Sequence, residues 1–444
     1  MVTDSGIGLG ASQGPPLAPI KDILTGKTKG EVTIRGWIYR TRSSGGICFI
    51  TIRDSTGILQ CTVKKGNVPD DVFADAGKAL IESSIILWGD VNEDKRAPGG
   101  FELRAKGLRV VHFAETYPIT KDQSDEWLLD NRHLWVRSRE MTNILRIRAT
   151  FMDLIHEFMK AEGFSETHSP SFVSGACEGG STLFEVKYFG EKVYLTQSWQ
   201  LYAEALAMSL EKIYTIAPSF RAEKSRTRRH LTEYWHFEME AAWWSNEDTM
   251  QFEERLLEFM VQRLLKERRE ELDLLKRDIS KLEKVKAPFE RVPYTKAIEI
   301  MQKNGLAIEY GADFGYEEEK VLTAVFEKPF FIVDFPTSIK PFYHRPDPDR
   351  PNVVLCHDLL APEGYGEIVG GGERIWEKDV LEKRLSEGNI DPTPYQWYID
   401  LRRYGSVPHS GFGMGVDRVI TWICGLDHIK HVIPFPRMMR RVYP

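Results

Sequence analysis

The stretch FRAEKSRTRRHLTEYWHFEME, residues 220–240, decides the fold that we predict for this chain. It is typical of a strand, a charged loop and a returning strand. Arg221 and Glu223 lie two residues apart at the end of the first strand, so their side chains point to one face. Glu238 and Glu240 share a face of the second strand in the same way. The loop carries more positive charge than a turn needs, from Lys224, Arg226, Arg228, Arg229 and His230. A sheet surface with cations at its rim and carboxylates beyond them suits a nucleoside triphosphate and a small polar substrate.

A second stretch, GFGMGVDR at residues 411–418, offers another arginine, Arg418, to such a site. Its glycines occupy every second position, which would weaken an ordinary strand but suits close approach of the backbone to a ligand. Taken alone, Arg221 and Glu223 are equally consistent with an ion pair at an exposed strand end. The two arginine stretches together favour a triphosphate site on an antiparallel sheet.

Composition places the chain among ordinary globular proteins. Its 444 residues suffice for two or three domains, and 42% hydrophobic with 28% charged residues is the usual balance of such domains. The net charge of -6 excludes a basic nucleic-acid coat, so RNA contacts must come from local basic patches. The five cysteines lack CxxC spacing, which argues against a disulfide framework and against a zinc site.

Residues 1–18 are predicted to form a flexible tail. The first sixteen residues are rich in Gly, Ser and Pro and contain no Lys or Arg, unlike a signal or transit peptide. No apolar run approaches the length of a membrane span. We therefore expect a cytoplasmic protein without a membrane partner.

Five short strands are expected in a first domain at residues 19–117. Turns such as SSGG and DSTG separate segments of alternating apolar residues. This number of strands in so short a domain predicts an OB-type barrel, and Gly36 fits the bend that such a barrel needs. The expected strands are 32–38, 47–53, 58–63, 85–91 and 101–111.

A polar linker is expected at residues 118–136, followed by a second domain at 137–444. Apolar residues recur at helical spacing over 139–160, and a second strongly helical stretch covers 248–282. Most strands follow one another directly, which predicts an α+β domain with a mainly antiparallel sheet and flanking helices. The expected strands are 182–188, 193–196, 212–220, 233–244, 330–335, 352–360 and 364–375.

Several motifs resemble those of the class II aminoacyl-tRNA synthetases. FRAE with the RH of the loop resembles motif two, GFGMGVDR motif three, and GFSETHSP (residues 163–170) motif one, whose proline lies at the dimer interface of that family. A barrel ahead of such a domain is the layout of the subclass that charges aspartate, asparagine and lysine. The resemblance therefore implies an N-terminal OB-fold followed by a class II catalytic domain, and a homodimer. By itself, GFSETHSP is also consistent with an ordinary helix stop and turn.

Longer segments resemble one branch of this subclass, the asparaginyl-tRNA synthetases of archaeal and eukaryotic type. The resemblance covers nearly everything after residue 30. The segments that carry it are EGGSTLF, QSWQLYAE, SRTRRHLTEYWHFEME, GEIVGGGERI and DPTPYQWYIDLRRYG.

The resemblance implies an ATP site whose catalytic residues are Arg221 and Arg418. Arg221 would bind the α-phosphate and Arg418 the γ-phosphate, while Glu223 would accept from the adenine amino group. Arg229 and His230 would bind the outer phosphates. The other residues implied at the ATP site are Glu367, Gly413 and Gly415.

A magnesium site is implied beside the phosphates, at Asp358 and Glu367. Carboxylate oxygens suit that ion. Asp358 is also consistent with a solvated carboxylate at a strand edge. In aspartyl relatives a serine often stands three residues after the second carboxylate, whereas Gly370 stands there in this chain.

The amino-acid pocket is the part of the resemblance that bears on substrate choice. Glu178 and Gln200 would receive the ammonium and carboxylate ends of the substrate, and Arg374 would donate to its side-chain carbonyl. Aspartyl enzymes carry a lysine in the motif QSPQLYKQ, and Ala203 takes its place here. Glu238 would accept from an amide NH2 and repel a carboxylate. The alternative role for Glu238 is that of a structural acid paired with a loop arginine.

The barrel is implied to bind the anticodon of a tRNA. Phe49 matches the family's stacking aromatic residue and Gln60 the side chain that reads the central uracil. Arg40 and Arg42 would hold phosphates. Taken alone, Phe49 is more typical of a barrel core; its register with Arg53 and Gln60 favours base stacking.

The activity that the resemblance implies is the activation of L-asparagine with ATP and its transfer to the 3′ end of tRNA(Asn). Three alternatives remain. Ala203 and Glu238 disfavour an aspartyl enzyme, including one that serves both tRNAs. The barrel disfavours an asparagine synthetase of related fold. The two ATP-site arginines disfavour a non-catalytic RNA-binding descendant.

We predict that Arg221→Ala abolishes adenylate formation and leaves tRNA binding largely intact. Loss of one group that stabilises developing charge commonly costs about a hundredfold or more in rate. ATP–pyrophosphate exchange measures the first property and a filter-binding assay with tRNA the second. Exchange at close to the unsubstituted rate would show that Arg221 does not bind the α-phosphate.

Overall fold

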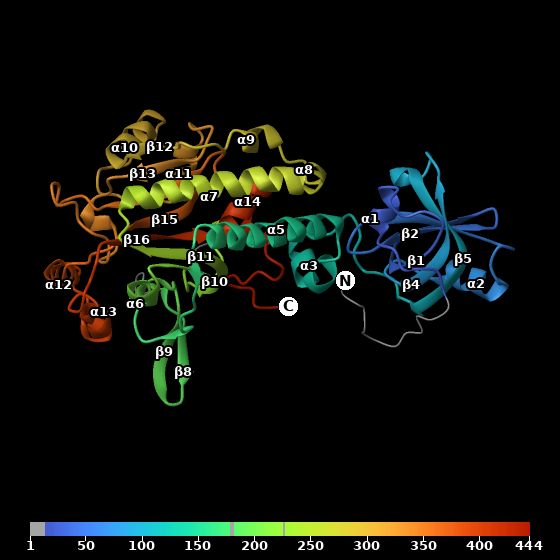
Figure 1. Cartoon of the computed structure of the whole chain (residues 1–444), viewed down its shortest axis with the longest axis horizontal. Helices are drawn as coiled ribbons and strands as arrows, with labels where there is room; N and C mark the ends of the chain where they lie inside the picture. Colours follow the sequence, from blue (N-terminus) through green and yellow to red (C-terminus); the bar gives the residue numbers. More distant parts are fainter. Residues whose placement is uncertain (1–13, 178–181, 225–226) are drawn as a thin grey trace. The chain divides into compact units, whose positions relative to one another are not determined.

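The computed structural model describes residues 14–177, 182–224 and 227–444 (Figure 1). The chain divides into two compact units, Met1–Gln123 and Ser124–Pro444, and each is considered by itself. Most of the tail expected at residues 1–18 lies outside the described residues. Within them, every helix is too short or too polar to cross a membrane.

The first unit contains a closed five-stranded barrel, which confirms the predicted OB-fold. Its strand order is β1-β2-β3-β5-β4, and β1 closes the barrel because it pairs with both β2 and β4. The strands are β1 Glu31–Ser44, β2 Ile47–Arg53, β3 Ile58–Lys64, β4 Ser84–Glu93 and β5 Phe101–His112, and the helices are α1 Ile20–Leu24, α2 Asp70–Lys78 and η1 Pro98–Gly100.

Alternating side chains fill the barrel. Ile50, Ile52 and Leu59 point inward and are fully buried, while the residues between them are half-buried on the outer surface. Gly36 lies where β1 crosses closely over β2, since a Cβ there would stand 2.2 Å from the carbonyl oxygen of Arg53. Gly36 was expected to allow a bend in the strand; in the structure it allows the backbones of β1 and β2 to approach closely.

The second unit is built on an eight-stranded sheet with the order β12-β13-β14-β15-β16-β11-β10-β6. Only the outermost pairs, β12 with β13 and β6 with β10, are parallel, so the predicted mainly antiparallel sheet is confirmed. The strands are β6 Ser165–Glu166, β10 Lys212–Phe220, β11 Glu233–Ala242, β12 Glu290–Pro293, β13 Phe330–Val333, β14 Cys356–Ala361, β15 Gly366–Glu373 and β16 His409–Gly415. A small sheet holds β7 Phe172–Val173, β8 Glu185–Tyr188 and β9 Glu191–Leu195.

Helices α5 (Arg139–Ala161), α7 (Asn246–Glu267) and α14 (Val416–Cys424) cover one face of the large sheet (Figure 1). Phe252 of α7 packs on Phe412 of β16, which in turn contacts Phe237 of β11 edge to face. Glu238 and Glu240 alternate with Phe237 along β11 and therefore point to the opposite face. That opposite face carries the candidate site.

Two expectations differ from the structure. The helical stretch at 248–282 breaks into α7, α8 (Arg269–Leu274) and α9 (Ile279–Glu283). The first break falls at Arg268, whose φ of -127° and ψ of 25° are not helical. At the second, Lys276 adopts a positive φ of 61° and Asp278 caps the next helix. The segment 118–136 contains helices α3 (Asp125–Asp130) and α4 (Arg132–Trp135). The side chain of Arg132 is fully buried and donates hydrogen bonds to backbone carbonyl oxygens near the C-terminus, among them those of Lys430, Ile433 and Pro434. These contacts join residues about 300 positions apart, so the polar sequence of the segment does not predict them.

The other helices surround the edges of the second unit. Of these, α10, α11 and α13 lie in sequence for which no element was expected. They are α6 Gln200–Leu210, α10 Tyr294–Lys303, α11 Tyr316–Thr323, α12 Lys378–Glu387 and α13 Gln396–Asp400, with short turns η3 Thr337–Ile339, η4 Thr393–Tyr395 and η5 Ile429–His431.

Candidate active site

One row of residues crosses four strands of the large sheet and joins the predicted substrate and metal residues. Glu238 of β11 pairs with Gly413 of β16, Gly413 with Gly370 of β15, and Gly370 with Asp358 of β14. Paired residues of neighbouring strands share a face. A carboxylate therefore stands at each end of the row, with two glycines between them.

The glycines of β16 make room for side chains of β11. A Cβ on Gly413 would stand 2.5 Å from Nε2 of His236, and one on Gly411 would stand 2.2 Å from Oε2 of Glu240. The period-two glycines were expected to let the backbone approach a ligand. In the structure, the groups that approach them are these two side chains, which lie flat on the sheet and line the cavity above it.

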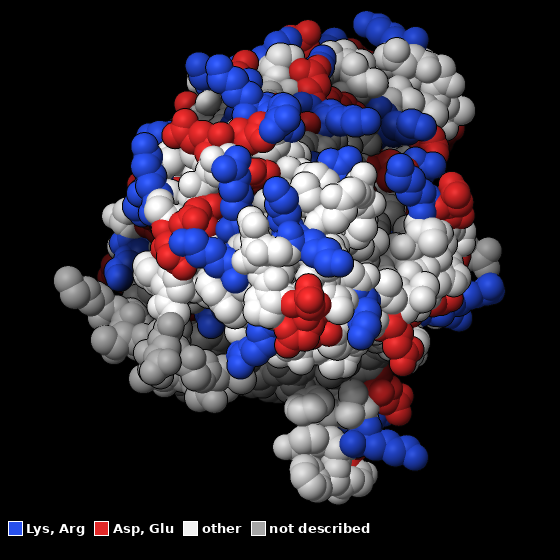
Figure 2. All heavy atoms as spheres, turned by 90° about the vertical axis from the view of Figure 1, so that its right-hand side faces the viewer, with Lys and Arg blue, Asp and Glu red and all other residues white. Residues whose placement is uncertain are grey.

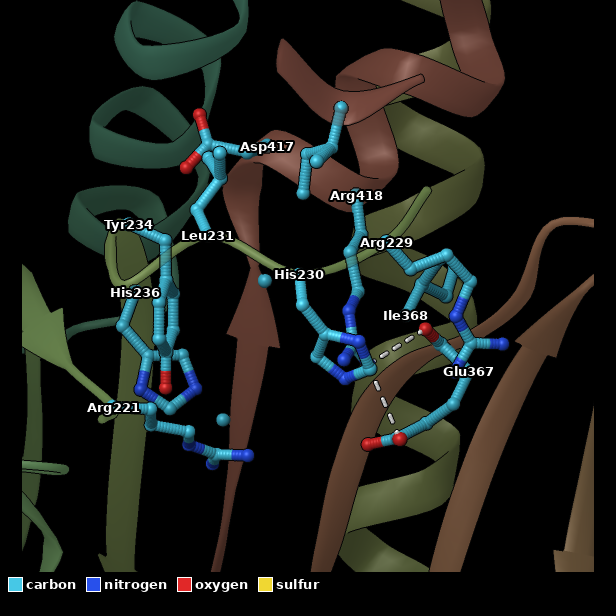
Figure 3. Close-up of a pocket in the computed structure, with 13 residues that line it drawn as sticks. Arg221, Arg229, His230, Leu231, Tyr234, His236, Glu367, Ile368, Asp417 and Arg418 are labelled. Atoms are coloured by element: carbon cyan, nitrogen blue, oxygen red, sulfur yellow. Dashed lines mark hydrogen bonds and ion pairs between the residues drawn. The ribbon is translucent and has the colours of Figure 1, made fainter. Parts of the chain in front are cut away.

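A cavity of about 60 Å³ lies at the end of β16, next to α14 (Figure 3). The side chains of Arg221, His230 and Arg418 point toward its centre. Three residues that the sequence predicted to bind phosphates therefore line one cavity. Nη1 of Arg418 lies 3.2 Å from both a carboxylate oxygen and the carbonyl oxygen of Glu367. The Arg221 guanidinium lies 5.7 Å from the centre of the Tyr234 ring.

Arg229 and His230 differ in what they can offer to phosphates. Arg229 forms a two-pronged ion pair with Glu319 of α11, with one bond of 3.0 Å. His230 lies 3.6 Å from Glu223, and burial together with Arg418 lowers its pKa to about 4. His230 is thus neutral at pH 7 and acts there as a hydrogen-bonding group. Glu223 lies at the edge of this region and does not line the cavity.

Asp358 and Glu367 converge on Gly370. A Cβ on Gly370 would stand 3.3 Å from Oε1 of Glu367 and 3.5 Å from Oδ1 of Asp358. Two converging carboxylates fit Mg²⁺, which is usually held by one or two carboxylates together with substrate phosphates. No set of three or more His, Cys, Asp or Glu suited to a metal ion occurs among the described residues. A serine at position 370 would reach into this gap, and glycine leaves it open.

Lys340 was not predicted and contacts one of these carboxylates. Its Nζ lies 2.6 Å from Oδ2 of Asp358, inside the larger cavity described below. Burial raises the pKa of Asp358 to about 6, against the effect of Lys340. Burial also opposes ionisation of Glu367, but Arg418 and the other cations lower its pKa to about 2. At neutral pH both carboxylates are therefore mainly ionised.

A larger cavity of about 300 Å³ lies over the row from Glu238 to Asp358. It is lined by Gln200, Glu238 and Arg374, which the sequence placed in the amino-acid pocket. Glu178, the fourth residue predicted there, lies outside the described residues. The two cavities adjoin, because both are lined by Arg221, His236, Glu367 and Gly413.

Glu238 is bound by the turn that leads into α6. It accepts hydrogen bonds from the Ser198 hydroxyl and, at 3.0 Å, from the backbone N–H of Trp199. Burial raises the pKa of Glu238 to about 7, although these two donors favour its charged form. Its contacts are thus with Ser198, Trp199 and His236 (3.4 Å). No loop arginine within the described residues is among them, and Arg226 of the loop lies outside those residues.

Two further buried carboxylates belong to this region and were not predicted. Glu240 accepts from Nε and Nη2 of Arg374. Glu204 accepts from Arg402, from the Tyr398 hydroxyl and, at 3.2 Å, from Nε2 of Gln200. Glu240 shares a strand face with Glu238 in the sequence, so alternation was a usable signal for it. Nothing in local spacing identifies Glu204.

The outer surface of the barrel brings together the residues predicted to bind an anticodon. Arg42 pairs with Phe49 across β1 and β2, with its guanidinium 4.4 Å from the ring centre. Arg40 pairs with Thr51, which pairs with Gln60, in the next row. Phe49 is half-buried on the outside, so it is not a core residue. Basic and acidic side chains are interspersed over the surface seen in Figure 2, and no single large basic patch dominates it.

Comparisons with known families agree with this architecture. Residues 124–439 match the family described as tRNA synthetases class II (D, K and N), and residues 32–111 match the OB-fold nucleic acid binding domain. The first match covers well over half of the chain. The chain belongs to the class II tRNA synthetases of this group.

Individual relatives narrow the assignment. The chain is 50% identical to an asparagine–tRNA ligase of Thermoplasma acidophilum over 93% of this chain and 96% of the relative, and 48% identical to that of Thermococcus gammatolerans over 96% and 98%. The crystal structure of asparaginyl-tRNA synthetase from Pyrococcus horikoshii complexed with asparaginyl-adenylate superimposes with a TM-score of 0.92 at 46% identity, covering 94% of this chain and 97% of that one. Within its group, the chain belongs to the asparagine–tRNA ligases, which confirms the resemblance seen in the sequence.

We predict that Gly413→Ala lowers the rate of asparagine-dependent ATP–pyrophosphate exchange about tenfold or more. The added Cβ would displace the His236 ring, which borders both cavities. Thermal unfolding should show that the variant is folded. Gly77→Ala in α2, where a Cβ meets no atom within 4 Å, is the matched control and should leave exchange unchanged. Unchanged exchange in Gly413→Ala would show that the position of His236 does not matter to the reaction.

Proposed function

We propose that this chain joins asparagine to tRNA(Asn) in two steps within the adjoining cavities. The asparagine carboxylate attacks the α-phosphorus of ATP and releases pyrophosphate, and a ribose hydroxyl at the 3′ end of the tRNA then attacks the activated carbonyl. The observation that carries the proposal is the shared border of the two cavities at Arg221, His236, Glu367 and Gly413. Substrates in the two cavities would meet beside Arg221.

Catalysis in this proposal comes from positioning and charge stabilisation, with no protein nucleophile. Arg221 binds the α-phosphate and Arg418 the γ-phosphate, since a guanidinium fork matches phosphate oxygens. Asp358 and Glu367 would hold Mg²⁺, which neutralises phosphate charge when bound. Arg229, which lines the smaller cavity and is held in place by Glu319, would bind the outer phosphates.

The choice of asparagine over aspartate follows from charge. Glu238 faces the cavity and accepts from an amide NH2, whereas it repels a carboxylate when ionised. Ala203 is fully buried and supplies no compensating cation. Arg374 donates to the side-chain carbonyl while its charge is shared with Glu240. A polar group left unpaired or repelled in such a site discriminates strongly between close analogues.

The tRNA contacts are proposed to come from the outer face of the barrel. Phe49 and Gln60 lie there with Arg40 and Arg42 in adjacent rows, an arrangement suited to stacking and reading unstacked bases.

We predict that asparagine alone supports ATP–pyrophosphate exchange at pH 8, and that its advantage over aspartate shrinks as the pH falls toward 6. The pKa of Glu238 is raised to about 7, so protonation below that pH removes the charge that repels aspartate. Glu238→Gln should make the ratio of kcat/KM for the two amino acids small and independent of pH. Glu233→Gln, on the same strand but outside both cavities, is the control.

The same assay separates the alternative functions. Exchange with aspartate at pH 8 would favour an aspartyl enzyme or a related asparagine synthetase. No exchange with either amino acid would favour an RNA-binding descendant.

We further predict a homodimer, on the resemblance of GFSETHSP to motif one. Sedimentation equilibrium should give twice the chain mass of 51.1 kDa. A species of one chain mass at micromolar concentration would contradict this assignment.

A further inference from the structure

Arg374 and Glu240 form an ion pair in the wall of the larger cavity. Arg374 is 3% exposed and Glu240 is 1% exposed, so water screens the pair very little. Nε and Nη2 of Arg374 both donate to the carboxylate, at 3.1 Å to Oε1 and 3.1 Å to Oε2. This is the two-pronged geometry that guanidinium and carboxylate groups adopt as an ion pair.

The pair uses one edge of the guanidinium and leaves the other for a ligand. A guanidinium can bind a carboxylate through the edge formed by Nε and Nη2 or through its outer edge. Glu240 occupies the first edge. Gly411 permits this position, because a Cβ at residue 411 would stand 2.2 Å from Oε2 of Glu240. The sheet is thus built to seat this carboxylate against Arg374.

Neighbouring cations are paired in the same way. Lys340 in the cavity wall binds Asp358, and Arg402 behind the wall binds Glu204. Ala203 supplies no charge. Arg374, like Lys340 and Arg402, therefore lies beside a carboxylate that balances its positive charge.

We propose that Glu240 is a specificity-determining residue that acts through Arg374. By pairing with Glu240, Arg374 becomes a donor of nearly balanced charge that binds the amide oxygen of asparagine and does not compensate the carboxylate of aspartate. Glu238 repels aspartate directly, whereas Glu240 acts by cancelling the cation that would attract it. The inference rests on the proposed role of Arg374 in reading the substrate side chain.

The test is Glu240→Gln, which keeps the shape of the side chain and removes its charge. The ratio of kcat/KM for asparagine over aspartate in ATP–pyrophosphate exchange should fall about tenfold or more, mainly because aspartate improves. The dissociation constant of aspartate, measured calorimetrically without ATP turnover, should fall in parallel.

Glu254→Gln is the matched control. Glu254 is also a buried carboxylate paired with an arginine, but its partner is Arg291 and it lies on α7, which covers the opposite face of the sheet. It does not line the cavity. This variant should therefore leave the ratio of kcat/KM for the two amino acids unchanged.

If kcat/KM in Glu240→Gln falls equally for asparagine and aspartate, so that their ratio is unchanged, the inference is overturned and Glu240 is a structural residue. If that variant does not fold, Glu240→Asp retains the charge, so discrimination should persist; its loss there would also overturn the inference. Exchange with asparagine by the unsubstituted chain tests the proposed function separately. Full activity with asparagine in Arg374→Met would show that Arg374 does not bind the substrate side chain.

Discussion

The site depends on the pairing of buried charges. Removing one partner of such a pair strands the other away from water, which is strongly destabilising. Arg374 with Glu240, Lys340 with Asp358 and Arg402 with Glu204 meet this constraint across different elements. The pairs connect Glu204 of α6, Glu240 of β11 and Asp358 of β14 to residues outside those elements, so they fix side-chain positions around the cavity as well as its charge.

The two ends of the site differ in how firmly their pairs are held. At the amino-acid end, the side chains of Arg374 and Glu240 are 4% and 1% exposed, whereas those of Arg418 and Glu367 at the ATP end are 20% and 35% exposed. A partly solvated pair costs little to open, because water replaces each lost contact. Arg418 can therefore exchange its carboxylate for phosphate, while Arg374 keeps its partner. The first arrangement suits binding of a highly charged ligand and the second suits discrimination between neutral and charged side chains.

The sequence alone predicted the elements with strong hydrophobic periodicity and the site residues that lie in recognisable motifs. The barrel strands, the long α5 and the strand–loop–strand around Arg221 were all predicted, because alternation and charge are visible locally. The partners that orient those residues were not: Lys340, Glu319 and Glu204 each make contacts that no local spacing encodes. The helix break near Lys276 was also missed, since a left-handed residue other than glycine leaves little trace in composition.

Strand register explains why both ends of the site must be considered together. Glu238, Gly413, Gly370 and Asp358 lie in one row only because β11, β16, β15 and β14 pair in this register. A slip of one residue in β16 would turn Gly413 to the helix-covered face and move the bulky ring of Phe412 from that face to the open one. The aromatic packing of Phe412 on Phe237 and Phe252 opposes that slip. The packed face of the sheet therefore sets the geometry of the open face, where the carboxylates and glycines create the substrate cavity.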